Sequence, residues 1–315
     1  MAQFIYSAVI LALLTGSAFA SDLKIILNNA TGGHMINARI VAKYLPRYMP
    51  DTDVVFQAMP GANGVVALNY IYNVAPRDGS EIATVDSKSF MQAIMREPGV
   101  KYDMAKMEWL GSFVDGRKEP FLLMAKAGQD RLIGGSEASF SINHIKLINS
   151  ILKWDIQNIS GYTDQGQTKL AFERGEINLV AYSLTGIRTT VPHWLGDTSI
   201  MPLVQYGAGR NRHPSFPNVP TVAEFCILDE DCKMLQTFEA TMTLIRSFVA
   251  PPKTDKERLL ALRNSLAAVM VDPDYVAEAK KVGIEVSPVS WLEAQELIQQ
   301  MSKTPFETVS RLRLF

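Results

Sequence analysis

Glycine-rich segments recur in this sequence where a short apolar run gives way to a helical pattern. They cover residues 28–33, 60–64, 134–136 and 161–166. Because glycine has no Cβ, a ligand can approach the backbone closely there, and the free N–H groups at a helix N-terminus favour an anion. A glycine between a strand and a helix also serves as a plain turn, so one such segment is weak evidence. Their repetition favours a site for a small anion such as a carboxylate.

Two side chains in these segments carry polar groups suited to an anion. His34 directly follows Gly33 and could donate a hydrogen bond, although a solvated residue in the first turn of a helix is the alternative interpretation. Tyr162 follows Gly161 and could present its hydroxyl to a ligand. The other histidines are interpreted as ordinary surface or partly buried residues; they are His144, His193 and His213.

Motifs for nucleotides, metals and nucleophilic catalysis are missing from the sequence. Residues 28–33 do not form GxGxxG, and GxxxxGK[ST], GxSxG and HExxH are absent. We therefore expect no cofactor, no metal site and no enzymatic activity, although distant residues could still assemble an acid and a base. The two cysteines, Cys226 and Cys232, lie in a short polar segment without further zinc ligands, which favours a local disulfide.

The elements that must position these segments alternate along the chain. Strands are predicted at residues 23–27, 54–58, 81–85, 121–125 and 177–182. Helices are predicted from His34, over residues 65–74 and 141–152, and up to Gly175. Capping pairs predict further helix starts at Thr221 with Glu224, Thr254 with Glu257, and Ser290 with Glu293. This alternation indicates a mainly parallel α/β sheet, in which ligand loops follow the carboxyl ends of the strands.

Length and composition set the broad class of protein. The 315 residues suffice for about two domains, and 47% apolar with 20% charged residues is typical of a globular chain. The net charge of −1, with both signs interspersed, argues against a nucleic-acid partner. Residues 5–14 form a short apolar run before Ala18-Phe19-Ala20, which predicts a signal peptide over residues 1–20. An uncleaved N-terminal anchor is the alternative, and both place the globular part outside the cytoplasm.

Several longer segments together resemble one family. They are GGHMINAR (32–39), MPGANGVVALNYIYNVAPRDG (59–79), WLGS (109–112), FPNVPTVAE (216–224), FVAPPKT (248–254) and MVDPDYVAEAKKVGIEV (270–286). They are similar to the substrate-binding proteins of tripartite tricarboxylate transporters, the Bug-type periplasmic receptors. The resemblance covers nearly the whole chain after residue 20, and PGANG with the downstream DG and the NVPTVAE segment are its most specific parts.

The resemblance implies an α/β, two-lobed periplasmic binding protein-like fold with a ligand cleft between the lobes. Lobe 1 would comprise residues 21–114 and 248–315, lobe 2 residues 115–247, and the chain would cross near residues 112–117 and 246–250. Ligand-binding residues are then expected at Ala30, Thr31, Gly32, Gly33, His34, Met35, Ala62, Asn63, Thr84, Ser87, Gly135, Ser136, Ser139, Tyr162 and Asp164.

Two positions depart from the family pattern. Family members commonly carry Asp where this chain has Met35, and often Gly where it has Asp164. Loss of the first carboxylate would weaken recognition of an amino group or an ordered water, whereas Asp164 would add negative charge near a bound acid. Met35 could favour a more apolar acid, and Asp164 could select a ligand that carries a cation.

The resemblance implies a role in capturing a small organic acid in the periplasm. The closed form would dock on the membrane permease subunits of a tripartite carrier, or alternatively on a sensor kinase. An exported enzyme is the remote alternative. No heptad or large apolar repeat demands an oligomer, so a monomer is expected.

Overall fold

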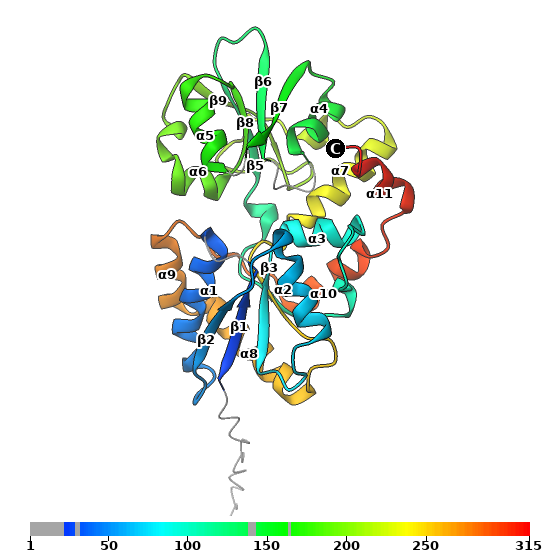
Figure 1. Ribbon diagram of the computed structural model, residues 1–315. Coiled ribbons are helices and arrows are strands. Elements are labelled where there is room, and N and C mark those ends of the chain that lie inside the picture. Colours follow the sequence, from blue (N-terminus) through cyan, green and yellow to red (C-terminus); the bar gives the residue numbers. More distant parts are fainter. Residues whose placement is uncertain (1–21, 29–31, 138–142, 163–164) are drawn as a thin grey trace, which may run out of the picture.

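A computed structural model shows two α/β units stacked one above the other (Figure 1). It describes residues 22–28, 32–137, 143–162 and 165–315. Each unit is built on a sheet of five strands. We use lobe 1 for the unit whose sheet contains the first strand, β1, and lobe 2 for the other.

The lobe 1 sheet has the strand order β2-β1-β3-β10-β4. Its strands are β1 (Leu23–Leu27), β2 (Val54–Ala58), β3 (Glu81–Val85), β4 (Glu108–Ser112) and β10 (Ser247–Ala250). β1 pairs in parallel with both β2 and β3, whereas β10 runs antiparallel between β3 and β4. The carboxyl ends of β1, β2 and β3 therefore meet at one end of this sheet.

Helices cover both faces of the lobe 1 sheet, because β1 is apolar at successive positions. Leu23, Ile25 and Leu27 pack into one core cluster with α1, α8 and α9. Ile26, on the opposite face, packs with α2 and α10. The helices of this lobe are α1 (Gly32–Tyr44), α2 (Val65–Asn73), α3 (Ser87–Ile94), α8 (Lys256–Val271), α9 (Pro273–Lys281) and α10 (Trp291–Met301).

The lobe 2 sheet has the order β7-β6-β8-β5-β9. Its strands are β5 (Phe121–Lys126), β6 (Leu132–Glu137), β7 (Ile156–Tyr162), β8 (Leu179–Ser183) and β9 (Ile200–Tyr206). β6, β7 and β8 run parallel, and β5 is antiparallel to β8 and β9. Leu123 of β5 packs with α4 (His144–Leu152) and α7 (Asp229–Thr241), whereas Leu122 and Met124 pack with α5 (Gln165–Arg174) and α6 (Leu184–Thr190).

Three segments lie side by side where the lobes join. Phe113 N–H donates to the carbonyl of Arg246 over 3.1 Å and the Phe113 carbonyl accepts from Ser287 N–H over 3.1 Å. Gly116 N–H donates to the carbonyl of Thr243 over 2.8 Å. The last helix, α11 (Phe306–Leu312), then packs on α7 of lobe 2, and Leu312 shares a core cluster with α7. The C-terminal end thus also contacts lobe 2 (Figure 1).

The predicted α/β class and most predicted elements are confirmed. The strands predicted at residues 23–27, 54–58 and 81–85 have those bounds, and those predicted at residues 121–125 and 177–182 correspond to β5 and β8. The disulfide between Cys226 and Cys232 is also present. The predicted signal peptide lies outside the described residues. Within the described chain, no helix combines the length and the apolar character needed to span a bilayer.

Two predicted loops are wrong. Residues 134–136 lie inside β6, which pairs on both sides, with β7 and with β8. Glycine is required there by packing, because a Cβ on Gly134 would come within 2.8 Å of Ile145 and one on Gly135 within 2.3 Å of Ile177. The loop predicted from Gly161 begins later, since β7 runs on to Tyr162.

The capping pairs gave mixed outcomes. Ser290 caps α10, accepting a hydrogen bond from Glu293 N–H over 3.2 Å as predicted. The predicted pair of Thr221 with Glu224 is also present, since Glu224 Oε1 accepts a hydrogen bond from Thr221 N–H over 2.9 Å, but the helix that begins there is a short 3-10 helix at residues 222–224. The prediction for Thr254 is wrong, because Asp255 caps α8 and the Thr254 hydroxyl donates instead to the carbonyl of Pro251.

Candidate functional site between the strand carboxyl ends

Six parallel strands end in the region between the lobes. In lobe 1, β1 leads into α1, β2 into α2 and β3 into α3; in lobe 2, β6 leads into α4, β7 into α5 and β8 into α6. Figure 1 shows the two sheets on opposite sides of this region. Ligands of open α/β sheets bind outside the strand carboxyl ends, and helix N-termini there present free N–H groups. This region is therefore the candidate site.

The first predicted loop opens α1. Gly32 and Gly33 are the first two residues of this helix, whereas Ala30 and Thr31 lie outside the described residues. His34 is half-buried, and its pKa is lowered to about 4, mainly by burial. The charge of Asp86 opposes this shift, whereas the charges of Arg246 and Lys88 add to it. The ring is thus neutral at pH 7 and carries one donor and one acceptor nitrogen.

Met35 is part of the lobe 1 core packing and does not lie free in a ligand loop. It is half-buried and packs against the core cluster of β1, α1 and α8. Its apolar character is thus explained by the core. The effect of Met35 on ligand choice stays a prediction.

The PGANG turn is held in place by α3. Gly61, Ala62, Asn63 and Gly64 all have positive φ angles, from 45° to 141°. The Ala62 carbonyl accepts a hydrogen bond from the Gln92 side chain over 3.2 Å. The side chains of Ala62 and Asn63 are exposed beside the carboxyl end of β2, so both remain candidates for ligand contact.

Polar residues at the end of β3 help to hold the fold together. Thr84 is buried, and its hydroxyl donates to Oδ1 of Asn28 over 2.9 Å. Asn28 Nδ2 is also buried and has no hydrogen-bond partner among the described residues. Ser87 is the first residue of α3, whose N-cap Asp86 accepts a hydrogen bond from Ser89 N–H over 3.0 Å. Asn28 adds a donor that the sequence reasoning did not select.

The lobe 2 residues form a second polar group. Ser136 Oγ accepts hydrogen bonds from the side-chain amides of Asn143, over 2.6 Å, and Asn158, over 3.2 Å. Tyr162 is half-buried, burial raises the pKa of its hydroxyl, and its ring would lie 3.1 Å from a Cβ on Gly135. The predicted contacts Ser139 and Asp164 lie outside the described residues.

His144, interpreted from the sequence as an ordinary surface or partly buried histidine, is half-buried at the first position of α4. Its Nδ1 lies 2.9 Å from the Tyr206 hydroxyl oxygen, and its ring packs edge-on against Phe238. Burial, with a smaller contribution from the charge of Lys88, lowers its pKa to about 3. Because Lys88 belongs to α3 of lobe 1, a charge from one lobe acts on a ring of the other.

Arg246 is a further residue that the sequence analysis did not select. It lies in the segment that joins the lobes, only 8% exposed, and its charge also acts on His34. Burial lowers the pKa of its guanidinium, and the nearest acid to act on it is Glu119. No local motif marks Arg246, since its surroundings come from distant parts of the chain.

The arrangement is shared with solved structures of solute-binding proteins. A TctC solute binding protein from Polaromonas is 13% identical, with 93% of this chain and 96% of that one covered and a TM-score of 0.67. MatC from Rhodopseudomonas palustris, solved with bound malate, is 17% identical, with 92% and 99% covered and a TM-score of 0.63. The periplasmic binding protein BugD is 16% identical, with 93% and 97% covered and a TM-score of 0.63. The chain has the fold of a periplasmic binding protein.

The likeness to proteins of this fold is structural rather than close in sequence. No protein-family model matches the chain, and no curated protein matches it by sequence. The predicted two-lobed periplasmic binding protein fold is confirmed, because the matches extend over almost the whole length of both partners.

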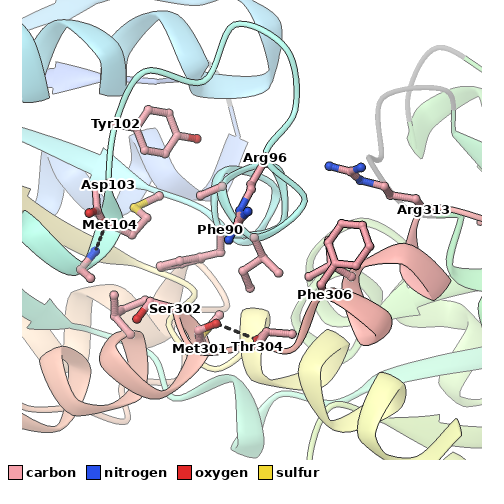
Figure 2. Close-up of a pocket in the computed structure, with 15 residues that line it drawn as sticks. Phe90, Arg96, Tyr102, Asp103, Met104, Met301, Ser302, Thr304, Phe306 and Arg313 are labelled. Atoms are coloured by element: carbon pink, nitrogen blue, oxygen red, sulfur yellow. Dashed lines mark hydrogen bonds between the residues drawn. The ribbon is translucent and has the colours of Figure 1, made fainter. Parts of the chain in front are cut away.

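A pocket of about 440 Å³ lies away from the strand carboxyl ends of this periplasmic binding protein fold. Figure 2 shows it between α3, residues 102–105, α10 and α11, with Phe90, Met301 and Phe306 in its wall. It contains none of the predicted site residues. In the described part of the chain, no cluster of histidine, cysteine and acidic side chains could hold a metal ion.

Proposed function

We propose that this protein is an extracytoplasmic solute-binding protein that captures a small carboxylate between its lobes and delivers it to a membrane transporter. The observation that carries the proposal is the convergence of six parallel-strand carboxyl ends, three from each lobe, on one region. α1, α3 and α4 begin there, and the partial positive charge of a helix N-terminus favours an anion.

The polar side chains around these helix starts support an anionic ligand. Lys88 on α3 and Arg246 bring two cations close to the neutral ring of His34. Asn28 and Tyr162 add donors at the ends of β1 and β7. We therefore extend the ligand-binding set predicted from the sequence by Asn28, Lys88 and Arg246.

The ligand class follows from this chemistry and from the solved structures. MatC of the same fold holds malate, a small hydroxydicarboxylate. A mono-, di- or tricarboxylate of this size would pair with the cations here and accept hydrogen bonds from the helix N-termini. The proposal assigns the protein binding and release without a catalytic step.

Closure of the two lobes would bury the ligand. Lobe 1 corresponds to residues 21–114 and 248–315 and lobe 2 to residues 115–247, and the paired segments 112–116 and 243–247 would act as the hinge. Residues 1–20 would direct export to the periplasm and then be removed. The closed form would dock on the permease subunits of a tripartite carrier.

A thermal-shift screen of the chain from Ser21 onward tests the ligand class. The panel contains malate, succinate, adipate, citrate and benzoate, and each acid is paired with its neutral amide. An acid present at 100 times its dissociation constant raises the free energy of unfolding by about 2.7 kcal/mol. We expect a saturable rise in Tm with at least one acid and none with its amide. A rise with amides or amines alone would contradict the carboxylate class.

A further inference from the structure

The backbone pairing places Arg246 at the ligand end of the lobe 1 sheet. Ser247, the first residue of β10, lies opposite Val85, the last residue of β3, and the two strands are antiparallel. The residue before Ser247 therefore lies beyond the carboxyl end of β3, beside Asp86. Arg246 N–H donates to Ser112 Oγ over 3.3 Å, which fixes the backbone at the lobe junction.

The Arg246 side chain is buried, and among the described residues its Nε lacks a partner. Its Nε is inaccessible and has no hydrogen-bond acceptor in the part of the chain that the structure describes. No ion pair of the described residues includes this guanidinium either. A guanidinium has five donors and stays charged in proteins, so an unpaired one in a buried place destabilises the fold.

Glu119 and Asp86, the acids whose charges act on Arg246 and His34 respectively, have other hydrogen-bond partners. Glu119 accepts a hydrogen bond from the Thr185 hydroxyl over 2.5 Å and lies 3.7 Å from Arg188. Asp86 caps α3 and accepts from both the backbone and the hydroxyl of Ser89. His34 is neutral at pH 7. The local charges thus leave the donors of Arg246 available to an external anion.

Two less deeply buried arginines have clear partners. Arg263 is half-buried, lies 3.2 Å from the Glu108 carboxylate, donates to the Trp109 carbonyl over 3.0 Å and stacks 3.9 Å from the Trp291 ring centre. Arg117 forms a two-point ion pair with Asp115 at 2.8 Å. No comparable contact to the buried Arg246 Nε is found among the described residues, which favours a ligand as the partner of this guanidinium.

We propose that Arg246 is the anchor of the captured solute, binding its carboxylate through the guanidinium at the junction of the lobes. This inference rests on the proposed solute-binding function. The ligand is then an acid whose carboxylate reaches the hinge. Its negative charge balances the positive charge of the buried Arg246 side chain. Because Arg246 belongs to a crossing segment, engaging it also favours closure of the lobes around the acid.

The test compares Arg246→Met with the matched control Arg263→Met, using isothermal titration with malate, adipate, citrate and benzoate. Arg246→Met removes the unpaired charge at similar volume, so we expect a higher Tm than the wild type without acid. We also expect affinity for the preferred acid to fall on the order of 30-fold or more. Arg263→Met should lower Tm and leave the dissociation constant unchanged. Arg246→Lys keeps the charge without the fork and should bind with intermediate affinity.

Some results would overturn only the anchor role of Arg246, and others would overturn the proposed function as well. If the wild type and Arg246→Met bind the same acid with equal affinity, Arg246 is not the anchor, whereas the proposed solute capture stands. A fall in Tm for Arg246→Met comparable to that of Arg263→Met, with unchanged affinity, assigns Arg246 a structural role and also overturns it. If the wild type binds none of the four acids, both the function and the anchor are overturned.

Discussion

The Thr84 hydroxyl donates to Oδ1 of Asn28 over 2.9 Å, and this bond joins the ends of β1 and β3 inside the protein. Both residues are almost fully buried. Thr84 Oγ1 also lies 3.3 Å from the backbone nitrogen of Asn28, so one hydroxyl serves two groups of the same residue. The pair holds in place the residue that precedes the first ligand loop.

Replacing the Thr84 hydroxyl should therefore destabilise the protein. Thr84→Val leaves buried groups of Asn28 unpaired, which we expect to lower the free energy of unfolding by about 1–3 kcal/mol in urea denaturation. Thr52 is the matched control, because it is equally buried but its hydroxyl has no partner among the described residues. Thr52→Val should be neutral or stabilising. Equal losses in the two variants would contradict the role of the Asn28 contact.

Gly116 allows the close approach of the two crossing segments. A Cβ at this position would lie 1.7 Å from the Met242 carbonyl oxygen, which is backbone and cannot rotate away. We expect Gly116→Ala to lower the free energy of unfolding by about 3 kcal/mol or more, measured by chemical denaturation. Gly196→Ala is the control, because its nearest atom would be 4.0 Å away. If Gly116→Ala is as stable as the wild type and binds the ligand with unchanged affinity, the close packing of the two crossing segments is not required for stability or binding.

His144 makes stability depend on pH. Its pKa is about 3 in the folded protein and about 6.5 when unfolded, so the unfolded chain binds more protons between these values. Stability is therefore fully present above pH 6.5 and falls as the pH drops towards 3. Each pH unit in this interval corresponds to at most about 1.4 kcal/mol from this residue. His34 acts in the same direction between pH 6.5 and about 4.

Melting curves of His144→Gln between pH 7 and 4.5 test this dependence. The variant removes the titrating group, so its Tm should fall less steeply with acid than that of the wild type. His193→Gln, at an exposed position, should keep the wild-type slope. Parallel curves for all three proteins would show that His144 does not carry the acid sensitivity.

The disulfide between Cys226 and Cys232 closes a short loop before and within the start of α7. Restricting a loop of this length in the unfolded chain stabilises a protein by about 2 kcal/mol. We expect the double variant Cys226→Ala, Cys232→Ala to lose that amount in denaturant titrations. Reductant should lower the wild type to the same level and leave the double variant unaffected. An unchanged midpoint in the double variant would argue against a stabilising bridge.

The parts of the fold that could be predicted are those whose signal is local. β1 follows from the apolar run LKIIL, and β3 follows from a strand pattern after the Asp78-Gly79 turn. β6 was missed because Gly134 and Gly135 are typical of turns. Their lack of a Cβ is needed for contact with Ile145 and Ile177, which the sequence pattern does not show.

Site residues could be predicted where a loop follows a strand. They could not be predicted where residues from distant parts of the chain come together. Gly32 and Ser87 lie at the predicted helix starts. The half-buried His144 packs against Phe121, Tyr206 and Phe238, which lie in distant parts of the chain. Arg246 likewise becomes significant only through the antiparallel pairing of β10 with β3. Such positions depend on tertiary contacts and carry no local motif.

The most direct test of solute capture is a crystal structure of the protein with the acid that gives the largest thermal shift. We expect the acid between the lobes, at the carboxyl ends of β1, β3 and β6, with its carboxylate near the start of α1 or α3. An acid bound instead in the pocket between α3, α10 and α11, with the strand ends unoccupied, would contradict this expectation.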